Sequence, residues 1–133
     1  MAPKGIHIKA MGTFTTKVTP PGGEYIRVRF AGTELLRWNL SEVASVATGR
    51  WVLDVIIEGR TAGNPGSVEA HAVFHIWNDV SGGSARTWIH SAVGGAIPVN
   101  TTAAANLEIT WQWDTAAALN SATMRQCTVW AIN

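Results

Sequence analysis

Residues 106–132, NLEITWQWDTAAALNSATMRQCTVWAI, carry the clearest evidence for the fold. The first part of this stretch alternates between apolar and polar side chains, and its apolar positions are Leu107, Ile109, Trp111 and Trp113. Because successive side chains of a strand point to opposite faces of a sheet, this alternation predicts a half-buried strand. A second β-favouring run, residues 122–132, follows a connector of small residues. We therefore predict an antiparallel hairpin whose tryptophan face packs on a core.

Short alternating or β-branched segments recur along the rest of the chain, and turn-forming residues such as 19–23 and 64–66 separate them. The further strands are predicted at residues 6–11, 14–18, 25–31, 34–40, 50–58, 68–77 and 86–90. Segments 25–31 and 34–40 favour a hairpin, and the apolar segment 50–58 favours a central strand covered on both faces. About eight or nine short strands without a long helix predict an all-β fold, a sandwich or a barrel.

Two segments leave alternatives open. Residues 41–48 are compatible with a short helical turn capped by Ser41, or with a polar connection to the next strand. Residues 114–124 have a helical composition, so the sequence allows either a capping helix or a loop between the last two strands.

The composition indicates a single domain with a covered surface. Charged residues make up 14% of the 133 residues, whereas an ordinary soluble domain has about 25%. We therefore expect a partner to cover part of the surface, and homo-oligomerisation is the simplest explanation. The alternative is a monomer whose surface is rich in uncharged polar residues. The net charge of +1 shows no excess of the basic residues that bind nucleic acid, so we do not expect nucleic acid as a partner.

The chain has one cysteine, Cys127, so an intrachain disulfide and a cysteine metal cluster are both excluded. Its position in a strand-like run predicts a small buried apolar residue. No apolar run approaches the roughly 20 residues that cross a bilayer, and the N-terminus lacks the apolar core of a signal peptide. We therefore expect no membrane contact and synthesis in a cytoplasm.

The N-terminal residues 1–12 are predicted to form a loose arm and an edge strand, ahead of a single sandwich domain at 13–133. Lys4, Lys9 and Lys17 meet no acidic residue before Glu24, so this segment is locally positive. Lysines often protect the open hydrogen-bonding side of an edge strand. The alternative is an arm that pairs with a neighbouring subunit or docks on an acidic surface.

No catalytic motif appears in the sequence, which lacks a phosphate-binding glycine loop and a nucleophile elbow. His71 and His75 would lie about 13 Å apart along one strand, too far to share a zinc ion, so we expect surface or interface histidines. Asp54 is the candidate buried carboxylate, with Arg27 or Arg29 as its expected partner. A carboxylate without a nucleophile or second acid is not a catalytic site. We predict no enzymatic activity, no cofactor and no metal site.

Six of the seven tryptophans fall into two groups by their neighbours. Apolar neighbours surround one group, which is expected in the core or at an interface and comprises Trp38, Trp51, Trp111 and Trp113. Trp77 and Trp88 lie near the predicted loop 78–84 and are candidates for an exposed pair that contacts a partner or a sugar ring.

The C-terminal segment also carries a family pattern. It runs Leu107-x-Ile109-Thr110-x-Gln112-Trp113, then Thr115-Ala116-Ala117-x-x-Asn120-Ser121, then Met124-x-Gln126 and Val129. This pattern, about a fifth of the chain, resembles the ends of phage virion structural proteins. Those ends have a strand closing in QW, a small-residue loop and a last strand containing RQ. Such proteins are β-sandwich domains, often jelly rolls, that tend to trimerise and serve as capsid decoration, head-fibre or tail-tip modules.

The resemblance implies an antiparallel, jelly-roll-like β-sandwich in which residues 114–121 are a loop, and it supplies no catalytic residues. It implies a non-enzymatic, trimeric capsid decoration or cementing protein, located in the virion and assembled in the host cytoplasm. Its partner would be the major capsid protein or another virion protein. The candidate partner contacts are Lys4, Lys9, Lys17, Trp77 and Trp88. The alternative is a receptor- or glycan-binding tip module whose loops 59–67 and 78–84 contact a cell-surface glycan.

Overall fold

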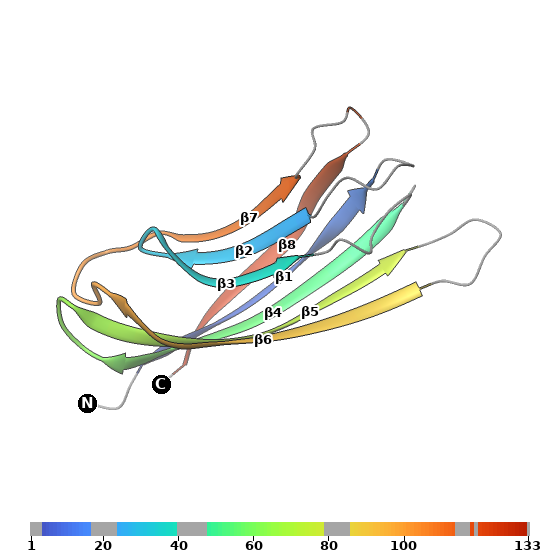
Figure 1. The fold of residues 1–133 in the computed structure, drawn as a ribbon. Coiled ribbons are helices and arrows are strands. Elements are labelled where there is room, and N and C mark those ends of the chain that lie inside the picture. The colour runs from blue at the N-terminus through green and yellow to red at the C-terminus, as the bar shows by residue number, and fades with distance from the viewer. Residues whose placement is uncertain are drawn as a thin grey trace.

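The computed structural model describes residues 4–16, 24–39, 48–78, 86–113, 118 and 120–132. These residues form eight strands and no helix (Figure 1). The strands are β1 (Gly5–Thr15), β2 (Glu24–Phe30), β3 (Thr33–Asn39), β4 (Gly49–Thr61), β5 (Gly66–Asn78), β6 (Arg86–Val99), β7 (Leu107–Trp113) and β8 (Ser121–Ile132). The predicted all-β class is therefore confirmed.

The strands form two antiparallel sheets of unequal width. A five-stranded sheet has the order β6-β5-β4-β1-β8, and a three-stranded sheet has the order β3-β2-β7. Figure 1 shows the smaller sheet lying as a second layer across the larger one. This arrangement confirms the antiparallel β-sandwich. Because one sheet has two strands fewer, it cannot cover the whole inner face of the other.

The hydrophobic core lies between the sheets and is built mainly from alternate residues of β1 to β5, with partly buried residues of β7 packed against it. In β4 the buried residues are Trp51, Leu53, Val55 and Ile57. Phe74 of β5 is fully buried, with its ring centroid 5.9 Å from Trp38 and 6.3 Å from both Trp51 and Trp111. Burying a side chain of this size stabilises the fold by about 1.5–3 kcal/mol. The predicted core positions of Trp38 and Trp51 are confirmed.

Strands β7 and β8 do not form the predicted hairpin. Strand β7 pairs with β2 in the smaller sheet, while β8 pairs with β1 in the larger one. The connection between them therefore crosses from one sheet to the other. The prediction was wrong because alternation reports that one face of a strand is covered, and it does not identify the strand beside it. Residues 114–117 and 119 of the connection lie outside the described residues, as do 41–47.

The N-terminal strand is internal and not an edge strand as predicted. Strand β1 lies between β4 and β8, and its inward side chains Ile8, Ala10 and Phe14 are buried. The predicted piece 6–11 and the start of the piece 14–18 form one strand, with a register shift against β8 between Met11 and Gly12, while residues 17 and 18 lie outside the described residues. The predicted boundary between an arm and a domain at residues 12 and 13 falls inside this strand.

The predicted hairpin of residues 25–31 and 34–40 is present as β2 and β3. Its turn is made by Ala31 and Gly32, which both have positive φ, at 51° and 78°. Few residues other than glycine adopt this conformation, so Gly32 suits the turn and Ala31 is the unusual member. The predicted central strand is β4, which is buried on its inner face and only partly covered on its outer face.

Candidate interaction surface

The last strand, β8, is exposed along nearly all of its length although its sequence is apolar. Val129 is 51% exposed, Met124 and Trp130 are 44% exposed, and Ile132 is 37% exposed. Eleven of the twelve residues of β8 are exposed, and Thr128 is partly buried. Met124 and Val129 lie on the inner face of the strand, and Trp130 and Ile132 lie on its outer face, so both faces present exposed apolar side chains. Exposed apolar side chains of this kind favour the binding of another molecule.

The exposure of β8 follows from the unequal widths of the two sheets. Met124 lies opposite Gly12 and Val129 opposite Ile8 in the antiparallel register with β1. Residues opposite each other share a face of the sheet, and Ile8 is fully buried, so the Val129 side chain lies on the core side. It stays exposed because, among the described strands, the smaller sheet ends at β7 and none lies over β8. We call this side of the sandwich, between the edges of β7 and β8, the open side.

A cavity of about 260 Å³ lies on the open side, between the two sheets. Ile109 and Trp111 of β7 line one wall, while Ala122 and Met124 of β8 line the other. Trp51 and Phe74 lie among the lining residues, so the cavity reaches the aromatic centre of the core. Its walls are mainly apolar, with Thr110 and Thr123 as the polar side chains, which suits an apolar occupant better than a charged substrate.

The outer faces of the two sheets differ in character. The outer face of the smaller sheet carries ion pairs, Arg27 with Glu34 at 3.3 Å and Arg29 with Glu108 at 3.7 Å. The outer face of the larger sheet carries the exposed apolar side chains of Val73 and Ile89. It also carries Trp77, whose ring centroid lies 5.7 Å from that of His75. The larger sheet also carries ion pairs, His7 with Asp54 and Arg60 with Glu69, so it differs from the smaller sheet in its exposed apolar side chains and not in lacking charge.

The structure does not bring the predicted contact residues together. Lys4 and Lys9 are exposed near and within β1, whereas Trp77 is partly buried in β5 on the far side of β4. Trp88 lies opposite Ile76 in the backbone register of β6, and its side chain lies outside the described part of the chain. Lys17 also lies outside the described residues. No single patch of these five residues is therefore established.

The prediction of a buried Cys127 was wrong, because this residue lies on the exposed strand β8. The expected pairing of Asp54 with an arginine was also wrong. The Asp54 side chain is 41% exposed, and its Oδ1 lies 2.6 Å from Nε2 of His7. Arg27 and Arg29 belong to the other sheet and pair there with glutamates. The Asp54–His7 pair is thus a half-exposed contact between neighbouring strands.

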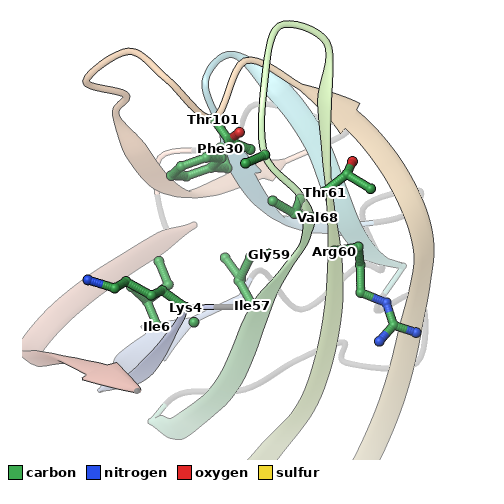
Figure 2. A pocket seen from close by; sticks show the side chains of 11 residues that line it. Lys4, Ile6, Phe30, Ile57, Gly59, Arg60, Thr61, Val68 and Thr101 are labelled. Atoms are coloured by element: carbon green, nitrogen blue, oxygen red, sulfur yellow. The ribbon is translucent and has the colours of Figure 1, made fainter. Parts of the chain in front are cut away.

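A second cavity, of about 410 Å³, opens at the end of the sandwich near the start of β1 (Figure 2). Its apolar wall is formed by Ile6, Phe30, Ile57 and Val68. The hydroxyl of Thr101 accepts a hydrogen bond from the Gly63 amide at 2.9 Å. The Arg60 guanidinium, which points away from the cavity in Figure 2, lies 2.6 Å from Glu69. These rim groups are engaged within the chain, so the cavity offers mainly apolar contact.

The remaining histidines do not assemble a metal site in the part of the chain that is described. His71 Nε2 lies 3.1 Å from Glu69 Oε1, and no group of three His, Cys, Asp or Glu side chains in these ranges could hold a metal ion. Within the same ranges no helix is long and apolar enough to span a membrane.

Comparisons with protein-family models, with characterised proteins and with solved structures give no match for this chain. The class that the structure defines is an antiparallel β-sandwich with one open, apolar side. The sequence analysis missed this side. The sequence pattern that indicates this side is found in residues 122–132. Apolar residues occur there in both alternating phases, and Arg125 is the one charged residue.

Proposed function

We propose that this chain is a non-enzymatic structural protein of a phage virion, a homotrimeric jelly-roll-like subunit that decorates or cements the capsid. The observation that carries the proposal is the exposure of β8, in which eleven of the twelve residues are exposed and the apolar Met124, Val129, Trp130 and Ile132 are among them. Such a strand requires a partner. The resemblance of the C-terminal segment to phage virion proteins suggests that this partner is another subunit of a virion.

The mechanism would be burial of apolar area between subunits. A protein–protein contact of standard size removes about 1,600 Å² from water, and apolar area contributes roughly 25 cal/mol per Å². This gross stabilisation exceeds the cost of lost translational and rotational freedom when few polar groups are left unpaired. The low charge of the chain, 14% of its residues, limits the number of charged groups that association would desolvate.

Capsid attachment through the positive N-terminal residues remains part of the proposal. Deleting residues 1–11 would remove most of β1, which is an internal strand, so substitutions are the appropriate test. We expect the native chain to co-sediment with undecorated capsids. A Lys4→Glu/Lys9→Glu variant should bind about tenfold more weakly, equivalent to about 1.4 kcal/mol, because both side chains are exposed.

The matched control for this capsid experiment is Arg37→Glu, a charge reversal at an exposed side chain of the smaller sheet. It should leave capsid binding unchanged. Equal binding by the native chain and the Lys4→Glu/Lys9→Glu variant would count against the N-terminal anchor. If the native chain does not bind capsids at all, the decoration role is wrong.

A glycan-binding tip module is the second candidate function. The partly exposed Trp77 on the outer face of β5, with its ring beside that of His75, favours it, since sugar rings stack on aromatic faces. A glycan array separates the two candidates: binding to a defined sugar, together with no capsid binding, would favour the tip module.

A further inference from the structure

We propose that the open side of the sandwich is where copies of this chain associate, with β8 of one copy lying along β7 of the next. The inference rests on the homo-oligomeric part of the proposed function. It goes beyond that proposal because it specifies which surface is buried between copies and which two strands pair there. Both strands lie at the edge of their sheet, and together they line the 260 Å³ cavity of the open side.

The free edge of β8 lacks most of the features that normally prevent strand pairing. An edge strand presents unpaired N–H and C=O groups, and natural proteins protect it with charges, proline, bulges or short length. Strand β8 has twelve residues, no proline and one charged residue, Arg125. By contrast β6, at the opposite edge of the same sheet, contains Gly94, Gly95 and Pro98. Register shifts do not distinguish the two edges, because β8 also shifts against β1, at Arg125, as β6 does against β5. The β8 edge is therefore the one best suited to accept another strand.

A strand added beside β7 would also cover the exposed inner face of β8. It would extend the smaller sheet by one strand, in the direction where that sheet falls short of the larger one. The side chains covered in this way would include Met124 and Val129, together with the cavity wall at Trp111. The same contact would thus satisfy free backbone groups and bury apolar area.

The charges of the two edges indicate that the occupant is a second copy. Strand β7 carries one charged residue, Glu108, and β8 carries one of opposite sign, Arg125. Glu108 lies 3.7 Å from Arg29. None of the ion pairs found among the described residues includes Arg125. Placing β8 of one copy along β7 of the next brings these opposite charges to the same contact. Since the chain has a net charge of only +1, copies do not repel one another strongly.

Rotational symmetry allows this contact to close. Because the contact joins two different edges on one side of each copy, two copies can form it reciprocally about a two-fold axis, and more copies can form it head-to-tail around a ring. Head-to-tail contacts form a ring when the rotation closes, and a ring leaves no β7 or β8 edge free. A three-fold ring is the smallest cyclic arrangement beyond a dimer and agrees with the proposed trimer.

The test substitutes one exposed residue on each edge strand of the larger sheet. Val129→Glu places a charge on the open side, while Ile89→Glu places the same charge on β6, where Ile89 is 63% exposed. Neither position is buried within one copy, so both variants should fold. We expect sedimentation to give an oligomer for the native chain and for Ile89→Glu, and a monomer for Val129→Glu.

The outcomes separate this inference from the proposed function. A native oligomer that persists in Val129→Glu would overturn the assignment of the open side and leave the homo-oligomer intact. A monomeric native chain would overturn both. If Val129→Glu fails to fold, the rate at which Cys127 is alkylated in the native oligomer tests the open-side contact instead. The open-side contact predicts a rate about tenfold below that of the urea-unfolded chain, because thiol reactivity follows exposure. An equal rate contradicts it.

Discussion

Phe74→Ala is expected to lower the free energy of unfolding by about 4 kcal/mol, because Phe74 is fully buried where both sheets meet. Its ring contacts Trp51 of β4 in its own sheet, and Trp38 and Trp111 of the opposite sheet. Truncation removes the transfer free energy of the ring and leaves a cavity among rigid indoles that cannot collapse to fill it. Urea denaturation followed by tryptophan fluorescence measures the change.

The neighbouring residue Val73 provides the control for this measurement. It lies on the outer face of the same strand and is 37% exposed, so Val73→Ala should cost less than about 1 kcal/mol. Since domains of this size are stable by only about 5–15 kcal/mol, the difference between the two variants is large. Equal losses for Phe74→Ala and Val73→Ala would show that the aromatic cluster is not the centre of the core.

Gly12→Ala is expected to destabilise the chain by about 3 kcal/mol through crowding between β1 and β8. A Cβ atom at position 12 would lie 1.9 Å from the carbonyl oxygen of Thr123 and 2.8 Å from the ring of Trp51. The first of these atoms belongs to the backbone of β8, so the two strands would have to separate where their register shifts. The same variant should therefore also weaken self-association, because it displaces the strand that we place at the interface.

Gly95→Ala is the matched control for Gly12→Ala. Gly95 lies in β6 at the other edge of the sheet, and a Cβ atom there would have no neighbour within 4 Å. Its unfolding free energy should change by less than about 1 kcal/mol. The close approach of β1 and β8 at Gly12 would be disproved by a Gly12→Ala protein that is as stable as Gly95→Ala in urea.

The positions of most strands could be predicted because alternation is a local signal. The β2–β3 hairpin and strands β4 and β5 lie close to their predicted ranges, since each has one apolar face and turn residues at its ends. The same signal located β7. Strand partners could not be predicted, because hydrogen bonding to a neighbour occurs in the plane of the sheet, and side-chain alternation describes only its two faces.

This distinction explains the errors at β1 and β8. The exposed Lys9 shows that one face of β1 meets solvent, and it carries no information about whether strands lie on both sides. Cys127 was expected to be buried because it lies in a strand-like run. It is exposed because the smaller sheet does not extend over β8, a property of the whole fold that no local pattern contains.

The candidate surface was predictable only in general terms. Low charge indicated that some part of the chain is covered, and this expectation led to the oligomer proposal. The residues chosen from the sequence, Lys4, Lys9, Lys17, Trp77 and Trp88, were selected by charge and by proximity to loops. The exposed side chains of β8 were not chosen, because an apolar strand within a sandwich is ordinarily core.

The mass of the native chain in solution is the most direct test of the central claim, that this sandwich is complete only in an assembly. Sedimentation equilibrium at micromolar concentration should give three times the chain mass of 14.2 kDa. Amide hydrogen exchange on the same sample should show protection across β7 and β8, the two edges that the ring would pair. A species of 14.2 kDa with freely exchanging amides in β8 would contradict the account.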